Sequence, residues 1–180
     1  MVELVGFGYG AMNSIKRINV QNITSSVFAN YGYVLDYNTV QPTLINQDTC
    51  LKYCFDLDFN FSVMDDKYRL KIYIADKYEQ PIKIETMERH PLGYQLFYPI
   101  TDCPYIVVVA PGSEEPDENL IEAFYVQTGV GVMIRCGIWH HSLLALCNKA
   151  KYIVLENDVP GNCEFKPLLY SHEVVKYDSN

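Results

Sequence analysis

Short segments rich in β-branched and aromatic residues recur along the chain, and several of them alternate apolar and polar positions with a period of two. Most are bounded by Gly, Pro, Asn or Asp, which is typical of short β-strands joined by turns. A sheet with one apolar face must close on itself or pack on a second sheet, so the pattern predicts an all-β barrel or sandwich. Six strands are predicted, at residues 68–74, 81–85, 95–100, 105–110, 131–135 and 151–155.

Helical signals are limited to two short segments, expected at the periphery of such a barrel. Residues 117–125 follow a proline, begin with an Asp and an acidic first turn, and carry apolar residues at positions 120, 121, 124 and 125. This arrangement predicts a helix. Residues 25–30, which are followed by a Tyr-Gly pair, are a second candidate for a short helix.

Nothing in the sequence marks a boundary between domains, because it contains no internal repeat and no low-complexity linker. We therefore expect one domain over residues 1–180, with an N-terminal arm of about residues 1–16 and a C-terminal tail of about residues 165–180. The tail is expected to pack on the barrel as a strand or an arm.

The charge balance argues against nucleic acid as a partner. The chain has 14 Lys and Arg against 22 Asp and Glu, a net charge of −8, whereas phosphate backbones are bound through clustered positive charge. No apolar run approaches the roughly 20 residues that cross a bilayer, so no membrane partner is expected. The basic residues near the N-terminus follow the apolar ones, which is the wrong order for a signal peptide, so we expect a cytoplasmic protein.

The six cysteines are scattered through apolar segments, at positions 50, 54, 103, 136, 147 and 163. They lack the dense spacing of a disulfide scaffold and complete no zinc-binding set. We expect reduced thiols and no structural metal held by sulfur.

Three of the four histidines fall in two compact motifs, Glu-Arg-His-Pro-Leu-Gly-Tyr-Gln at residues 88–95 and Gly-Ile-Trp-His-His at residues 137–141. Glu88 and His90 are two residues apart, so on a strand their side chains share a face, and Gln95 opens the next predicted strand. One face of the barrel is therefore expected to present a carboxylate, an imidazole and an amide.

These two motifs resemble the metal motifs of the cupin superfamily. Glu88-x-His90 followed by Gln95 is similar to the first motif, in which HxH precedes a Glu. Residues 129–140 are similar to the second, Gly-x5-Pro-x-Gly-xx-His, with Arg135 at the proline position. The resemblance implies a cupin-type double-stranded β-helix barrel.

Further segments narrow the resemblance to the ureidoglycolate lyase family, long called ureidoglycolate hydrolases. The Glu-Arg-His-Pro-Leu-Gly and Trp-His-His blocks are the most specific, and the similarity runs from about residue 17 to Cys163. The family implies a barrel, usually a homodimer, that cleaves ureidoglycolate to glyoxylate and urea in allantoin breakdown.

That substrate implies roles for three catalytic candidates. One carbon carries a hydroxyl, a carboxylate and a ureido nitrogen, so cleavage needs a base at the hydroxyl, an acid at the nitrogen and a cation at the carboxylate. His90 and His140 are candidates for proton transfer, because imidazole titrates near neutrality. Glu88 could orient an imidazole, raise its pKa or coordinate a metal.

Four further residues are predicted to bind the substrate, namely Lys52, Gln95, Arg135 and Trp139. Lys52 would pair with the carboxylate, and Gln95 would offer an amide donor or a weak metal ligand. Trp139 would form an apolar wall that excludes water beside the imidazole. Arg89, which alternates away from this face, is expected to face outside or to pair structurally.

A divalent metal is possible but not required by the sequence. Its ligands would be Glu88, His90, Gln95 and His140, a mixed nitrogen and oxygen set that leaves room for water or substrate. The other histidines, His141 and His172, are expected to be structural.

The chain also departs from the family pattern. Many members have Tyr-His-Arg where this chain has Ile134-Arg135-Cys136. Arg135 either replaces the missing imidazole as a carboxylate clamp or indicates another substrate. Two other classes therefore stay open: a metal-dependent cupin enzyme such as an oxygenase or isomerase, and a cupin-like module that binds a small acid without catalysis.

Overall fold

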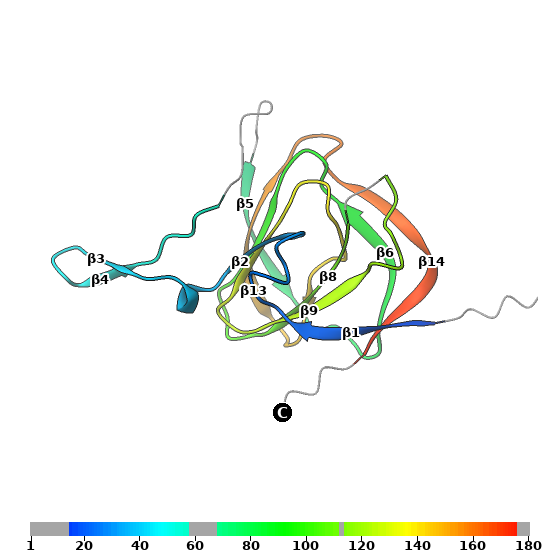
Figure 1. Cartoon of the computed structure of the whole chain (residues 1–180), viewed down its shortest axis with the longest axis horizontal. Helices are drawn as coiled ribbons and strands as arrows, with labels where there is room; N and C mark the ends of the chain where they lie inside the picture. The colour runs from blue at the N-terminus through cyan, green and yellow to red at the C-terminus, as the bar shows by residue number, and fades with distance from the viewer. Residues whose placement is uncertain (1–14, 58–67, 112–113, 176–180) are drawn as a thin grey trace, which may run out of the picture.

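The computed structural model describes residues 15–57, 68–111 and 114–175, and their regular structure is almost entirely β-strand (Figure 1). One sheet contains β1 (Lys16–Asn22), β6 (Ile82–Arg89), β8 (Tyr105–Ala110), β9 (Glu122–Val126), β11 (Trp139–His140), β12 (Leu144–Ala145) and β14 (Glu164–Val175). A second sheet contains β2 (Gly32–Leu35), β5 (Tyr68–Ala75), β7 (Gln95–Pro99), β10 (Gly131–Ile134) and β13 (Ala150–Asn157). All six predicted strands are confirmed, within a few residues at their ends.

The larger sheet closes on itself. Its strand order is β11-β6-β14-β1-β9-β8-β12, and β11 pairs both with β6 and with β8. The smaller sheet, in the order β2-β10-β7-β13-β5, packs beside it to complete the barrel seen in Figure 1. The predicted all-β barrel is therefore confirmed.

Two hydrophobic cores result from this arrangement. The first lies between the two sheets and includes Phe97 of β7, Val107 of β8 and Tyr152 of β13. The second draws on all seven strands of the larger sheet and includes Trp139 and Val108. Strand β8 serves both cores, because alternate side chains point to opposite faces of a strand, and all six of its residues are buried.

Strand β6 changes which core its side chains face. Ile84 and Met87 both pack in the second core, although they are three residues apart. Two consecutive exposed residues, Glu85 and Thr86, separate them, and the ladder to β14 shifts register at the same place. The alternation of β6 therefore shifts by one position at this place, and the residues that follow face the opposite side. Glu88 consequently faces the space between the sheets.

The predicted helix at residues 117–125 is wrong. The Asp117 side chain accepts a hydrogen bond from the Asn119 backbone at 2.9 Å, but this closes only a turn. The apolar residues that suggested a helix belong to β9 and its approach, where Ile121 faces the second core and Phe124 the first. Burial on both faces of a strand removes the alternation by which strands are recognised.

The second predicted helix, at residues 25–30, is a turn closed by hydrogen bonds such as Phe28 N–H to the Thr24 carbonyl at 3.1 Å. The one helix among the described residues is a single 3₁₀ turn, Tyr37–Thr39. No helix in the described part of the chain is long and apolar enough to cross a membrane.

The predicted C-terminal tail is a strand. β14 is twelve residues long and lies between β6 and β1, so it belongs to the closed sheet rather than to an appendage. Most of the predicted N-terminal arm, residues 1–14, lies outside the described residues, and β1 begins at Lys16.

The expectation that all six cysteines are reduced thiols is corrected at one pair. Cys103 and Cys147 form a disulfide with a Cα–Cα distance of 5.8 Å. They lie just beyond the antiparallel pairing of β8 with β12, which brings residues 44 positions apart face to face. Cys50, Cys54, Cys136 and Cys163 are free.

A two-stranded hairpin projects from one side of the barrel in Figure 1. It consists of β3 (Thr43–Ile45) and β4 (Cys50–Lys52), which pair only with each other among the described strands. Leu44 and Leu51 stand directly opposite one another and are about half exposed. We call residues 43–52 the hairpin arm.

Candidate active site

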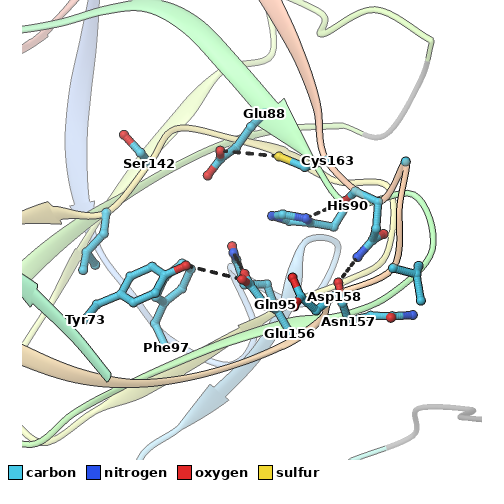
Figure 2. A pocket seen from close by; sticks show the side chains of 14 residues that line it. Tyr73, Glu88, His90, Gln95, Phe97, Ser142, Glu156, Asn157, Asp158 and Cys163 are labelled. Carbon is cyan, nitrogen blue, oxygen red and sulfur yellow. Dashed lines mark hydrogen bonds between the residues drawn. The ribbon is translucent and has the colours of Figure 1, made fainter. Parts of the chain in front are cut away.

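A cavity of about 390 Å³ opens between the two sheets (Figure 2). Strand β6 contributes Glu88, and His90 follows directly after it. From the facing sheet come Gln95 of β7, Glu156 of β13 and Tyr73 of β5. The cavity thus joins the first sequence motif to polar residues on the inner face of the smaller sheet.

The second motif places His140 directly behind the cavity wall, where it is 1% exposed and lies beside Glu88 without itself lining the cavity. It pairs with Glu88 across β11 and β6, so the two side chains point to the same side. The turn before β11 contains Gly137 at φ +77°, which favours glycine. The Gly137 N–H donates to the His90 carbonyl at 2.9 Å and fastens the two motifs together.

Both imidazoles are held in one tautomer. His90 Nδ1 donates to the Asn162 carbonyl at 2.7 Å, and His140 Nδ1 donates to the Ile138 carbonyl at 2.9 Å. Each neutral ring therefore keeps a lone pair on Nε2. Both Nε2 atoms are buried without a hydrogen-bond partner among the described residues, and the ring centroids are 5.3 Å apart.

Burial keeps these imidazoles neutral. It lowers the pKa of His140 to about 3, with a further lowering by the adjacent His90. Burial also lowers the pKa of His90. His140 Nε2 lies 3.5 Å from Glu88 Oε1, and because the ring is neutral this contact is not an ion pair. The two rings are better suited to accept a hydrogen bond or bind a cation than to take up or release a proton.

Glu88 is the group whose protonation state is balanced near neutrality. Burial raises its pKa to about 7, and the negative charge of Glu156 adds to the increase. A carboxyl group in this range can take up and release a proton at neutral pH. The exposed Cys163 thiol donates a long hydrogen bond to Glu88 Oε2, at 4.0 Å.

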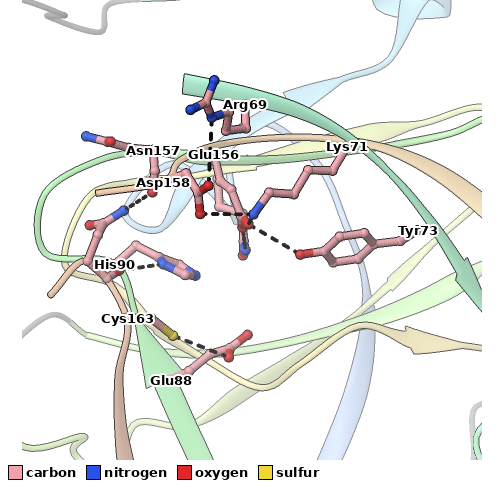
Figure 3. A network of polar contacts seen from close by, with 11 residues as sticks. Arg69, Lys71, Tyr73, Glu88, His90, Glu156, Asn157, Asp158 and Cys163 are labelled. Atoms are coloured by element: carbon pink, nitrogen blue, oxygen red, sulfur yellow. Dashed lines mark hydrogen bonds and ion pairs between the residues drawn. The ribbon is translucent and has the colours of Figure 1, made fainter. Parts of the chain in front are cut away.

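Gln95 is oriented by Glu156 (Figures 2 and 3). Its Nε2 donates to Glu156 Oε2 at 2.6 Å, while Lys71 Nζ at 2.5 Å and the Tyr73 hydroxyl at 3.3 Å donate to Oε1. Burial alone would raise the pKa of Glu156, but the hydrogen bonds from Lys71 and Gln95 lower it. A carboxylate can only accept hydrogen bonds, so the amide of Gln95 turns its NH₂ group toward Glu156 and its oxygen away from it.

The Gln95 oxygen is accordingly buried and has no hydrogen-bond partner among the described residues. The Gln95 NH₂ group donates one hydrogen bond to Glu156, so of the two roles predicted for Gln95 the oxygen ligand is the one that this orientation favours. Gln95, His90 and His140 all present lone pairs. The site therefore suits a cation or a ligand rich in N–H and O–H groups.

Glu88, His90 and His140 can converge on a metal ion. One ligand atom from each lies within 4.8 Å of the others. The hydrogen bonds that both Nδ1 atoms donate to backbone carbonyls fix the ring orientation, as is usual for metal-binding histidines. The unpaired lone pairs and the mixed nitrogen and oxygen set fit a divalent transition metal, with the Gln95 oxygen available as a weak fourth ligand.

Three residues predicted to bind the substrate do not line this cavity. Trp139 is fully buried in the second core, because alternation along β11 turns it away from His140. Arg135 donates to the Ala29 carbonyl and stacks over Tyr33, at a different hollow. Lys52 is exposed on the hairpin arm.

The expected structural roles of the other polar residues hold. Arg89 pairs with Glu164 at 2.7 Å and stacks over Trp139 at 4.8 Å. His172 is buried, with Nδ1 3.1 Å from the Tyr170 carbonyl and Nε2 3.3 Å from the Glu118 carbonyl. His141 packs edge-on against Tyr78.

The sequence analysis missed Glu156 and Lys71. Alternation along the strand at residues 150–157 could have indicated Glu156, because Tyr152, Val154 and Glu156 share the inward face. A carboxylate at the next inward position after two buried apolar residues is expected to be buried as well, and a buried carboxylate needs polar partners. Lys71 offered no such signal, since exposed lysines are common on strands.

Comparisons with known proteins agree with the sequence motifs. A family model described as ureidoglycolate lyase matches residues 15–174. A ureidoglycolate lyase of Pseudomonas paraeruginosa is 30% identical over 148 residues, which cover 82% of this chain and 88% of that protein. One of Pseudomonas entomophila is 28% identical over 82% of this chain and 89% of its own. Among solved structures, a 3,4-ketoisomerase from Helicobacter canadensis matches 75% of this chain and 90% of that chain with a TM-score of 0.44 and 13% identity.

Proposed function

Because the chain belongs to the ureidoglycolate lyase family, we propose that the cavity between its sheets cleaves ureidoglycolate to glyoxylate and urea. One observation carries the assignment to this cavity. Two buried neutral imidazoles direct unpaired Nε2 atoms toward the space beside Glu88, whose pKa burial raises to about 7. No comparable cluster of His, Cys, Asp and Glu occurs elsewhere in the described residues.

The reaction divides a carbon–nitrogen bond without any redox change. The hydroxyl of the substrate loses its proton, its oxygen becomes the carbonyl of glyoxylate, and the electrons of the carbon–nitrogen bond leave with the ureido nitrogen. That nitrogen gains a proton and departs as urea. Glu88 is the group we assign to this proton transfer, because its carboxyl can hold or release a proton near neutral pH.

The sequence-based assignment of His90 and His140 to acid–base catalysis is modified by their burial. Both are neutral and both present a lone pair. We assign them to binding, either of substrate O–H and N–H groups or of a metal ion. The Gln95 oxygen accepts from the ureido N–H groups or serves as a weak ligand, in the orientation that Glu156 imposes.

A divalent metal would supply the positive charge that the substrate carboxylate needs. Among the described residues no Lys or Arg lines the cavity, and Lys71 is engaged by Glu156 and Asp158. We propose His90 and His140 as the metal ligands, with Gln95 as a weak third, so that the Glu88 carboxyl beside them stays available for the proton transfer. A bound metal would stabilise the negative charge that develops on the hydroxyl oxygen.

The other classes that the sequence left open have no observation in the structure that favours them. A homodimer and a cytoplasmic location stay predictions from the resemblance and the sequence.

The assay is glyoxylate release from racemic ureidoglycolate by purified protein as isolated, after chelation, and after re-addition of Mn²⁺, Zn²⁺ or Ni²⁺. We expect release well above the spontaneous rate, loss on chelation and recovery with one of the metals. Glu88→Gln should lower kcat by about 10²- to 10⁴-fold. Glu85→Gln, an exposed position on the same strand, is the matched control and should leave kcat unchanged.

Two results would contradict this proposal in different ways. Full activity in protein that elemental analysis shows to be metal-free would contradict the metal site but would support the lyase activity. If folded protein supplied with metal releases no glyoxylate, the proposed lyase activity itself is wrong.

A further inference from the structure

The loop between β13 and β14 forms one wall of the active-site cavity. It consists of residues 158–163, and Gly161, Asn162 and Cys163 are among its residues that line the cavity. Asn162 is only 3% exposed although its side chain is polar. A buried amide is costly unless its NH₂ group and its oxygen both have partners, so the partners of this side chain indicate what it does.

The Asn162 side chain joins two segments that are far apart in the sequence. Its Oδ1 accepts from the Leu92 N–H at 2.7 Å, and its Nδ2 donates to the Asn157 carbonyl at 2.6 Å. Leu92 belongs to the turn between β6 and β7, and Asn157 is the last residue of β13. The amide therefore ties the loop after β13 to the turn that carries His90.

The backbone of Asn162 binds the same turn at a second point. Its carbonyl accepts from His90 Nδ1 at 2.7 Å, and this hydrogen bond is drawn in Figure 3. A neutral imidazole carries one N–H, so the carbonyl that binds Nδ1 leaves the lone pair on Nε2. His90 Nε2 is the buried atom without a hydrogen-bond partner among the described residues. The tautomer of His90 consequently depends on where the Asn162 carbonyl lies.

The local backbone places Asn162 in this position. Gly161 precedes it at φ +82°, a conformation that favours glycine, and the Asn162 N–H donates to the Val159 carbonyl at 3.2 Å. On the other side of the contact, a Cβ added to Gly93 would come within 2.6 Å of the Asn157 Cβ. The loop and the turn are therefore closely packed as well as hydrogen-bonded.

The next residue extends the influence of Asn162 to Glu88. The Cys163 thiol donates to Glu88 Oε2 at 4.0 Å, as Figure 2 shows. A displacement of Asn162 would move this thiol together with the carbonyl that binds His90. One loop residue thus controls a neighbour of each of the two groups, His90 and Glu88.

We propose that Asn162 is a positioning residue: its side chain holds its own carbonyl against His90 Nδ1 and so keeps the His90 Nε2 lone pair available to the ligand in the cavity. Asparagine suits this role because one short, planar group both donates and accepts, whereas aspartate only accepts. Hydrogen-bond partners that orient a ligand-binding histidine typically change affinity or activity by about 10- to 100-fold. The inference rests on the proposed function only for its effect on catalysis.

The tautomer of His90 is measured by long-range ¹H–¹⁵N NMR of the full chain with a chelator and without substrate, because the ring ¹⁵N shifts show which nitrogen carries the proton. The His90 signals are assigned as those missing from His90→Gln. We expect the wild type to show the Nδ1–H form alone and Asn162→Ala to show a mixture with the Nε2–H form. In the glyoxylate assay, Asn162→Ala should lower kcat/KM by about 10- to 100-fold.

Asn157→Ala is the matched control. Asn157 is 5% exposed, and its Nδ2 donates to the Leu92 carbonyl at 2.9 Å. The variant loses a buried hydrogen bond to the same turn but keeps the backbone carbonyl that accepts from Asn162. Both alanine variants should melt at a lower temperature than the wild type. Asn157→Ala alone should keep the wild-type tautomer of His90 and a kcat/KM within about 3-fold.

Asn162→Asp keeps the size of the side chain and its acceptance from Leu92 but cannot donate to the Asn157 carbonyl. It decides the question if Asn162→Ala does not fold, and its tautomer mixture and loss of kcat/KM should lie between those of wild type and Asn162→Ala.

Four results would overturn the proposal: a wild-type His90 that carries its proton on Nε2, a folded Asn162 variant that keeps the pure Nδ1–H form, a mixed tautomer with unchanged kcat/KM, or an Asn157→Ala protein with the tautomer mixture of Asn162→Ala. The NMR measurement contains no substrate. If the wild type releases no glyoxylate, the proposed function fails, and the tautomers still decide whether Asn162 positions His90.

Discussion

His140 and His172 are buried to the same extent, with 1% of each residue exposed, but their ring nitrogens have different neighbours. Each nitrogen of His172 lies against a backbone carbonyl oxygen, of Tyr170 and of Glu118. His140 has one such partner for Nδ1 and none for Nε2, and His90 repeats the pattern.

An unpaired polar atom in a protein interior costs free energy, on the order of 1 to 3 kcal/mol, and native structures contain few of them. Two such nitrogens face the same space beside Glu88, which indicates a ligand-binding site there. His172, by contrast, has the ordinary role of a buried histidine, which is to join β14 to the segment before β9. The two residues are of the same type and equally buried, so the difference in their hydrogen-bond partners distinguishes a functional histidine from a structural one.

Replacing each of these two histidines by alanine should produce the largest difference between them. His140→Ala should lower kcat/KM for ureidoglycolate by about 10³-fold or more, because it removes a binding nitrogen at the reacting atoms. His172→Ala should leave kcat/KM within about 3-fold and lower the free energy of unfolding by about 1–3 kcal/mol. Glyoxylate assays and urea unfolding of both variants measure this. Equal loss of activity in the two would show that burial alone explains both residues.

The raised pKa of Glu88 predicts a pH dependence of the free energy of unfolding that the Glu88→Gln variant should lack. Its carboxyl titrates near 4.5 in the unfolded chain and at about 7 in the folded protein, so between these values the folded state holds more protons. The free energy of unfolding of the metal-free protein should therefore fall as pH rises from about 4.5 to about 7, by at most about 3 kcal/mol. Glu88→Gln should remove this fall.

Urea titrations of both proteins with a chelator, from pH 4.5 to pH 8, give the measurement. Burial lowers the pKa of His140 to about 3, which makes stability rise with pH up to about 6.5. That contribution is common to both proteins and cancels in their difference. A difference that stays constant with pH would mean that Glu88 titrates normally in the folded protein.

The orientation of Gln95 gives the smallest of the three expected effects. Glu156→Gln should reduce kcat/KM by about 10- to 100-fold, since its amide no longer requires the Gln95 NH₂ group as a donor. Asp158→Asn neutralises the more exposed partner of Lys71, at 3.3 Å, which also pairs with Arg69 at 3.8 Å, and it should change kcat/KM by less than about 3-fold. If the two variants behave alike, the charge of Lys71 matters and the direction of the Gln95 amide does not.

The fold could be predicted from the sequence where only one face of a strand is buried, or where turns bound a short apolar run. Strand β7 is an example, with Gln95 and Phe97 facing inward and Tyr98 outward. Prediction failed at β9, whose two faces enter different cores and whose apolar residues mimic a helix. The disulfide between Cys103 and Cys147 was missed because it depends on the pairing of β8 with β12.

The candidate site was predictable as far as local spacing determines it. Glu88 and His90 share a face because they are two apart on or beside one strand, and the spacing from Gly137 to His140 identified the second motif. The neighbour of His140 was misplaced, since Trp139 alternates into the other core. The roles of Glu156 and Lys71 depend on strands that pair across long stretches of chain, which local spacing does not contain.

The break in the alternation of β6 also affects which wrong pairings the strand can adopt. If β6 paired with β14 without the irregularity at Glu85 and Thr86, strict alternation from Ile84 would turn Glu88 and His90 into the core that holds Trp139. Burying a carboxyl group there without partners would cost several kcal/mol, about as much as a small domain can spare. The same side chains that we assign to substrate also penalise the misregistered strand, so selection for catalysis at these positions would at the same time maintain the correct register.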